Sequence, residues 1–242
     1  MNETLCKFCG GAEPLIKAHI IPAGLYARPE KSKEALKIIS TDNPGRTRKS
    51  WTGIYDDELV CRACEDMWDS WDAYGIDFLR NIEKYAKPIL SEGRLLGYQS
   101  DDYDYSQLKL FFLSVAWRCG ASGRKEFCLV KLGPYQDKLK KVIENRNPNE
   151  PSGFDVSFTR FDDTNLGTAL LNPHCERFDG INYLSIYMYG FIVSVKMDRR
   201  PGASIFRPLT MHSGEPLRIA LRNFKNSPEH RLMFKMARDV PR

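Results

Sequence analysis

Two matched cysteine pairs, Cys6-Lys7-Phe8-Cys9 and Cys61-Arg62-Ala63-Cys64, decide the fold of the N-terminal part of this chain. A C-x-x-C turn presents two sulfurs from one tight turn, and two such turns supply the four soft ligands of a tetrahedral zinc site. Gly10-Gly11 follows the first pair and suits the turn, because glycine adopts positive φ without strain. The spacing therefore predicts structural zinc at Cys6, Cys9, Cys61 and Cys64. The alternative is two unrelated pairs, one of them redox-active.

The other three of the seven cysteines, Cys119, Cys128 and Cys175, stand apart, and we expect small buried side chains there. An odd number of cysteines and an N-terminus without a basic and then apolar segment favour a reduced, cytoplasmic protein over a secreted disulfide framework. Apolar runs stay well short of the ~20 residues that a membrane-spanning helix needs. We therefore expect no membrane partner.

The chain has 242 residues, of which 42% are hydrophobic and 28% are charged. These values suit one large domain or two small ones with a proper core. The net charge of +5 permits a nucleic-acid partner but does not argue for one, because the distribution of charge matters more than its sum.

The hydrophobic pattern changes character near residue 90. Before it, we expect strands over 15–22 and 51–55, a helix over 23–39, a polar loop over 40–50 and a helix over 62–87. After it, we expect a loop over 94–104, helices over 106–119, 135–145 and 228–237, and strands over 154–161, 167–171, 183–187 and 191–197. The predicted fold class is α+β, with a zinc-binding module over 1–90 and a mixed helix and antiparallel-sheet body over 91–242. Whether these are two domains or one fold built around the module stays open.

The order of features is C-x-x-C, a strand with a histidine, a loop, a strand, C-x-x-C and a helix. This order resembles the zinc-containing HNH endonucleases, which are treble-clef (ββα-metal) nucleases. The matching residues are the two cysteine pairs and Ala18-His19-Ile20-Ile21-Pro22, within about the first third of the chain. The resemblance implies a bacterial or phage endonuclease that hydrolyses DNA, including in restriction of foreign DNA. It also implies a homodimer or a partner protein, because such sites often work in pairs.

In that family the histidine of H-I-x-P is a general base that activates water, and His19 holds this position. A divalent cation, Mg²⁺ or Mn²⁺, holds the scissile phosphate. The family's aspartate before the base is Ala18 here, its asparagine falls near Asp56, and its helical histidine falls at Glu65. Carboxylates are good ligands for these cations, so Asp56, Glu65 or Asp69 are candidates to replace imidazole there.

The same departures leave other hypotheses open. His19 can be an ordinary hydrogen-bonded side chain, and the module can be an inactive zinc-binding unit that binds nucleic acid or a protein partner. A third hypothesis places the function in residues 100–242. There, His174-Cys175-Glu176 looks like a fragment of a metal site but lacks partners at a fixed spacing.

Charge is unevenly distributed along the first third of the chain. Residues 28–49 hold seven basic and three acidic residues, whereas residues 56–77 hold eight acidic residues and one basic residue. A site that binds both a phosphate and a cation needs basic residues beside acidic ones. Arg46, Arg48 and Lys49 are therefore the candidate nucleic-acid-binding residues. The alternatives are that the two surfaces pair with each other or that the loop is only solvated.

Overall fold

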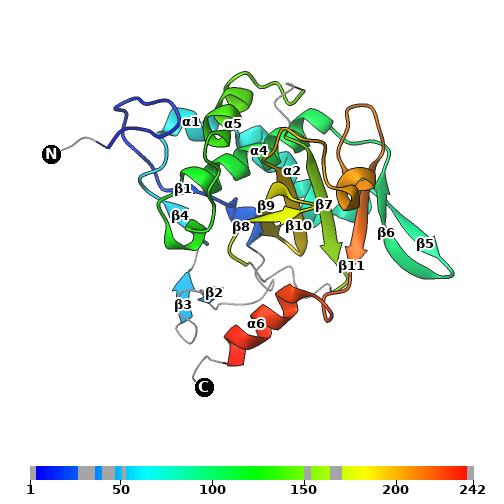
Figure 1. Cartoon of the computed structure of the whole chain (residues 1–242). Helices are drawn as coiled ribbons and strands as arrows, with labels where there is room; N and C mark the ends of the chain where they lie inside the picture. The colour runs from blue at the N-terminus through cyan, green and yellow to red at the C-terminus, as the bar shows by residue number, and fades with distance from the viewer. Residues whose placement is uncertain are drawn as a thin grey trace.

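The computed structural model describes residues 4–26, 36–39, 47–50, 53–149, 154–163 and 171–238. It confirms a mixed α+β fold with a large, mostly antiparallel sheet (Figure 1). In chain order the elements are β1 (Ala18–His19), η1 (Ala23–Leu25), β2 (Leu36–Ile39), β3 (Thr47–Ser50), β4 (Tyr55–Asp56), α1 (Arg62–Asp66), α2 (Asp69–Arg80), α3 (Ile82–Tyr85), β5 (Lys87–Ser91), β6 (Arg94–Ser100), α4 (Tyr105–Ala121), η2 (Lys125–Phe127), α5 (Tyr135–Glu144), β7 (Val156–Phe161), β8 (His174–Phe178), β9 (Ile181–Met188), β10 (Phe191–Lys196), η4 (Ser204–Leu209), β11 (Leu217–Arg222) and α6 (Pro228–Arg238).

The main sheet has seven strands in the order β5-β6-β11-β7-β10-β9-β8. All neighbours are antiparallel except β7 and β11, which pair in parallel. Three hairpins turn on a residue and a glycine that both have positive φ: Glu92-Gly93, Asp179-Gly180 and Tyr189-Gly190. Turns of this kind match the right-handed twist of the strands that they join, and they fix the register of β5–β6, β8–β9 and β9–β10.

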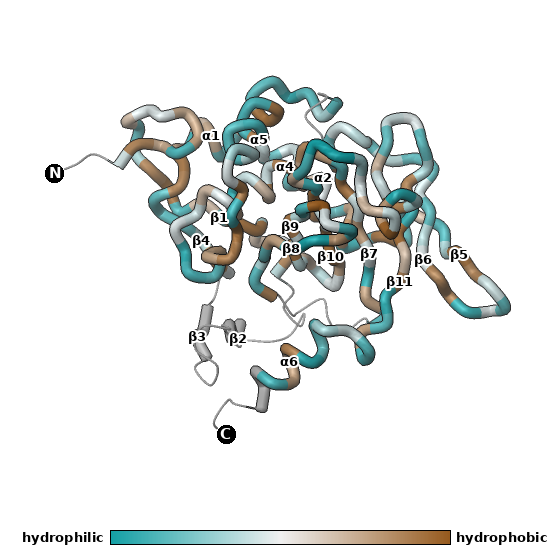
Figure 2. Tube along the Cα trace, viewed as in Figure 1, coloured by the Kyte–Doolittle hydropathy of each residue, from teal (hydrophilic) through white to brown (hydrophobic). Residues whose placement is uncertain are grey.

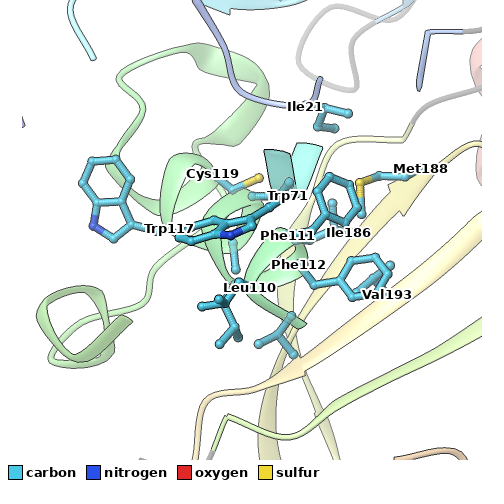
Figure 3. Packing of buried hydrophobic residues seen from close by; sticks show 14 of the residues in the cluster. Ile21, Trp71, Leu110, Phe111, Phe112, Trp117, Cys119, Ile186, Met188 and Val193 are labelled. Atoms are coloured by element: carbon cyan, nitrogen blue, oxygen red, sulfur yellow. The ribbon is translucent and has the colours of Figure 1, made fainter. Parts of the chain in front are cut away.

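Helix α4 fills the centre of the molecule. Its first turn is capped by the Asp104 side chain, which accepts a hydrogen bond from the Gln107 N–H at 2.9 Å. Every residue from Leu108 to Cys119 is buried, as a predicted core helix requires. Phe112 packs on Phe158 of β7, with ring centroids 5.2 Å apart. Figure 3 shows Phe112 and its neighbours on α4 facing side chains of β9 and β10.

Helix α2 approaches α4 closely at Gly75. A Cβ atom there would lie 2.2 Å from the ring of Phe111 on α4, so only glycine fits. The predicted single helix over 62–87 is in fact three helices, with breaks at Met67-Trp68 and at Asn81. Proline ends the helical run, as expected. Pro88 itself lies in β5, which is an edge strand, and an edge strand tolerates the missing N–H of proline.

Several sequence predictions in the N-terminal part are wrong. The predicted helix over 23–39 is a short 3-10 turn, η1, and a strand, β2, within the described part of that stretch. The predicted loop over 40–50 contains β3, and within the described residues the two predicted strands are reduced to the residue pairs of β1 and β4. For these strands, the pairing of β2 with β3 and of β1 with β4 decided the conformation, and local spacing did not indicate it.

In the body, the helices α4, α5 and α6 and the strands β7, β9 and β10 agree with the predictions to within a few residues. The predicted loop over 94–104 is wrong, because β6 occupies most of it. Strands β5, β8 and β11 were not predicted, and the strand over 167–171 falls mainly outside the described residues. In Figure 2 the tube of α6 changes between teal and brown, as in a helix with one apolar side.

One continuous buried cluster joins both parts of the chain. It contains residues of the cysteine pairs, of α2 and α4, and of β7, β9, β10 and β11. The N-terminal segment therefore packs on the same core as the sheet. Among the described helices, none is both long and apolar enough to cross a membrane.

Candidate metal centre and catalytic site

The four paired cysteines come together as the sequence predicts. Their sulfur atoms all lie within 4.8 Å of one another. The Cys6 and Cys64 sulfurs are 3.7 Å apart, and those of Cys9 and Cys61 are 3.8 Å apart. Zinc–thiolate bonds of about 2.3 Å at tetrahedral angles place sulfurs about 3.8 Å apart, so these thiols fit a four-thiolate metal ion.

Backbone geometry explains why the pairs meet. The first pair lies in a tight turn closed by hydrogen bonds from Cys6 N–H to Gly11 O (2.9 Å) and from Gly10 N–H to Cys6 O (2.8 Å), with Gly10 at φ +75°. Cys61 is the residue directly before α1, and Cys64 lies inside that helix. A bridge between Leu15 and Cys61 joins the two segments across more than forty residues of chain.

The thiol environment suits ligation by thiolates. Burial alone would raise the pKa of Cys6, but N–H groups of Cys9, Cys61 and Phe8 near its sulfur lower that pKa to about 7. Burial, together with the neighbouring thiols, raises the pKa of Cys64 above its ordinary range. Four thiolate charges held this close would repel one another, whereas a divalent cation bound between them would offset that repulsion and bind all four sulfurs.

An aromatic cluster fixes the metal centre to the rest of the molecule. Phe8, between the first two cysteines, packs edge-on against Trp68 and Trp117, with centroid distances of 5.5 and 4.8 Å. Trp68 lies just before α2 and Trp117 lies on α4. The first cysteine turn is therefore held in place by two helices as well as by its own hydrogen bonds.

The histidine predicted as a base lies on a small hairpin beside this centre. His19 of β1 pairs with Tyr55 of β4, and Ala18 pairs with Asp56. Ala18 and Asp56 are buried, whereas His19 and Tyr55 are half-exposed. Because side chains alternate along a strand, Asp56 points to the opposite face of the hairpin from His19. The structure thus does not bring these two predicted site residues together.

The carboxylate of Asp56 is instead occupied by hydrogen bonds within the fold. One oxygen accepts from the Glu58 N–H (3.0 Å), and the other accepts from the Ser122 hydroxyl (2.8 Å) and the Gly123 N–H (3.1 Å). Burial would raise the pKa of Asp56, but these donors lower it below its ordinary value. Asp56 therefore ties the hairpin to the end of α4.

A buried ion pair lies behind His19. The guanidinium of Arg118, fully buried on α4, makes two hydrogen bonds to the carboxylate of Asp72, at 2.8 and 2.6 Å. It also donates to the backbone carbonyl of His19 at 3.2 Å. Arg118 was not among the site residues predicted from the sequence. An arginine inside the most apolar segment of the chain was the available indication, because a buried charge requires a partner.

Glu65 lies on α1, next to this ion pair. Its carboxylate accepts a hydrogen bond from the Trp68 indole at 3.2 Å. Burial raises the pKa of Glu65, Asp72 and Asp69 raise it further, and Arg118 opposes them. The structure thus places Glu65 in the electrostatic surroundings of Arg118, the residue that holds His19. Asp69, the other carboxylate considered for a cation, is exposed at the start of α2.

The remaining predictions concern residues outside this cluster. Arg46 lies outside the described residues, and Arg48 and Lys49 lie on β3, which pairs only with β2 among the described strands. Cys119 is buried as predicted, but the prediction is wrong for Cys128 and Cys175, which are exposed. They lie in surface segments rather than in the core helix that contains Cys119.

Comparisons of the chain with protein-family models, with curated proteins and with solved structures found no match. A function for this protein must therefore be argued from the chemistry of its residues and their arrangement.

Proposed function

We propose that this protein is a divergent HNH-type, metal-dependent endonuclease built on a zinc-bound treble clef. One arrangement carries the proposal: the hairpin with His19 is joined directly to a four-cysteine cluster and leads into a helix that begins at Cys61. The Ile16 N–H donates to Val60 O at 3.0 Å, so the histidine strand and the second cysteine pair form one unit. Four thiolates leave no open position on zinc, which makes that ion structural.

In this proposal His19 is the general base. Its imidazole accepts a proton from water as the water oxygen attacks phosphorus, and the bond from phosphorus to the leaving oxygen breaks. Mg²⁺ or Mn²⁺ bound at Glu65, with Asp69 as a second carboxylate, would stabilise charge on the leaving oxygen. Arg118 positions the base by holding the His19 carbonyl, and Asp56 positions the hairpin from its other face.

The proposed substrate is DNA, contacted by the basic stretch that includes Arg46, Arg48 and Lys49. Charge supports this choice, because basic residues precede the hairpin strand β4 and acidic residues follow it. We further propose a role in restriction of foreign DNA, as a homodimer or with a partner protein, because a single site of this kind cuts one strand at a time.

A plasmid-nicking assay tests the proposal. Wild-type protein with Mg²⁺ or Mn²⁺ should convert supercoiled plasmid to open circles, and His19→Ala should abolish this while retaining one zinc per chain. His212→Ala is the matched control, because His212 is exposed and far along the chain in the segment before β11. Nicking by His19→Ala at the wild-type rate would refute the assignment of the base.

A second candidate function is an inactive zinc module that binds nucleic acid or a protein partner. Two observations favour it: Ala18 is fully buried where the family has a metal-binding aspartate, and all three hydrogen bonds to Asp56 are internal. In that case DNA binding should weaken steeply with salt, and neither cation should support nicking.

A further inference from the structure

A cavity of about 660 Å³ lies on the face of the main sheet opposite α4. Along β9 and β10, residues such as Ile186 and Val193 face the helices, so their neighbours Ser185 and Ser194 face the cavity. Segments η4 and α6 contribute walls. This volume falls in the range of about 300–1,000 Å³ that is usual for small-molecule sites.

The sheet is hollow here because small residues follow one another across its strands. Ser185 of β9 is in register with Ser194 of β10, which is in register with Ser157 of β7. Bulky side chains stand on both sides of this serine row: one cluster contains Tyr183 and Phe206, and the other contains Tyr187, Ile192 and Phe161. A gap one row wide therefore remains between two packed clusters.

Two hydroxyls on the floor of the cavity are available for a ligand. Thr159 and Ser194 both line it and are only 7% and 3% exposed. Within the described part of the chain, neither side-chain hydroxyl has a hydrogen-bond partner. Because both hydroxyls face the cavity, they are placed to hydrogen-bond to a molecule bound there.

The charges that line the cavity select against anions. The carboxylate of Glu229 is paired with the Arg222 guanidinium at 3.3 Å. The carboxylate of Glu176 accepts the Ser185 hydroxyl and lies 3.6 Å from the His174 ring, which is charged only when protonated. Apart from His174, the lining holds two carboxylates and one guanidinium, so Glu176 leaves one net negative charge, which attracts a cation and repels phosphate or carboxylate groups.

The rim of the cavity is apolar. Leu129, Ile205 and Leu232 line it and are 54%, 62% and 41% exposed. His174 and Tyr187 present stacked rings, with centroids 5.9 Å apart, at the same wall. Apolar side chains of this size favour the burial of a flat, apolar body beneath them.

We propose that this cavity is a binding site for a small aromatic amine, with the amine at Glu176 and the ring beneath the apolar rim. The floor hydroxyls of Thr159 and Ser194 bind the ligand's polar atoms. The site does not depend on the proposed nuclease function, because it uses only residues of the C-terminal body. The site also assigns a role to the segment His174-Cys175-Glu176, whose histidine and glutamate both line the cavity.

Two probes with the same ring and opposite charge test the proposal on the full chain. Tryptamine should show saturation transfer in ligand-observed NMR, and indole-3-acetate should bind at least about tenfold more weakly, equivalent to about 1.4 kcal/mol. Glu176→Gln should remove this preference, because it removes the charge and keeps the size. Ser194→Leu, which fills the floor, should abolish binding of both probes.

Leu90→Ser is the control, because Leu90 is equally exposed (60%) but lies on β5, outside the cavity lining. It should leave tryptamine binding unchanged. The proposal is overturned if tryptamine does not bind, if both probes bind wild type equally, or if Glu176→Gln retains the preference. These readouts decide the matter even if Ser194→Leu does not fold, and plasmid nicking by the same preparations is a separate result.

Discussion

Neutralising Asp72, the carboxylate partner of Arg118, should lower the stability of the fold more than a change to any surface ion pair. In the fold, the Arg118 guanidinium is fully buried and makes two hydrogen bonds to Asp72, whose side chain is 16% exposed. Asp72→Asn keeps the size and leaves the guanidinium with a neutral amide, the Ser114 oxygens and the His19 carbonyl. A buried charge left without its counter-charge costs about 3–5 kcal/mol.

We take about 3 kcal/mol, the lower end of that range, because the nearby Glu65 carboxylate also attracts Arg118. For a chain of this length, each kcal/mol corresponds to about 2–4 °C in Tm, so Asp72→Asn should lower Tm by about 6–12 °C. Thermal unfolding followed by circular dichroism at pH 7 measures this difference.

The matched control is Asp66→Asn. Asp66 forms an exposed i,i+4 pair with Arg62, in which the side chains are 53% and 69% exposed and the atoms are 3.7 Å apart. Such a pair contributes less than about 1 kcal/mol, so Tm should change by no more than a few degrees. If both substitutions lower Tm equally, the buried ion pair does not stabilise the fold in the way argued, and the positioning of His19 by Arg118 loses its support.

Three further predictions concern other parts of the fold. Cys9→Ser should weaken zinc binding by more than about 100-fold, because changes to residues around the ligands already cost about 10–100-fold in metal affinity. Cys128→Ser should leave the zinc content, measured by mass spectrometry, unchanged. Gly75→Ala should destabilise the protein by about 1–3 kcal/mol in urea unfolding, since the clash with Phe111 outweighs the roughly 1 kcal/mol gained in helix propensity; a stabilised variant would disprove the close contact. Asp56→Asn should cost about 1–3 kcal/mol at pH 7. Because the pKa of Asp56 is lowered in the folded state, this difference should hold above its ordinary value of 3.8 and shrink as the pH falls further; a difference equal at pH 7 and pH 3 would contradict this.

The success of sequence reasoning followed the strength of the local pattern. Helix α4 and strands β9 and β10 are buried almost continuously, and a short apolar run between turn residues marks each of them in the sequence, so their positions were predictable. The strand β6 was predicted as a loop that ends in the acidic run 101–104, whereas the structure pairs it with β5 and β11. Gly97 is required there, because a Cβ at this position would lie 2.2 Å from the backbone of β11. A contact with a strand more than a hundred residues later leaves no local pattern.

For the sites, the sequence alone determined the four-cysteine cluster, because the ligands of a metal are specific residue types at a spacing set by turn geometry. Only the tertiary structure decided that Asp56 faces away from His19, that Arg118 and Asp72 stand behind it, and that a row of serines opens a cavity. Each of these depends on which strand or helix lies opposite, and therefore on long-range packing. The spacing of residues in the sequence shows which metal ligands one turn can hold. The pairing of distant segments decides which polar groups are buried, paired or exposed to a ligand.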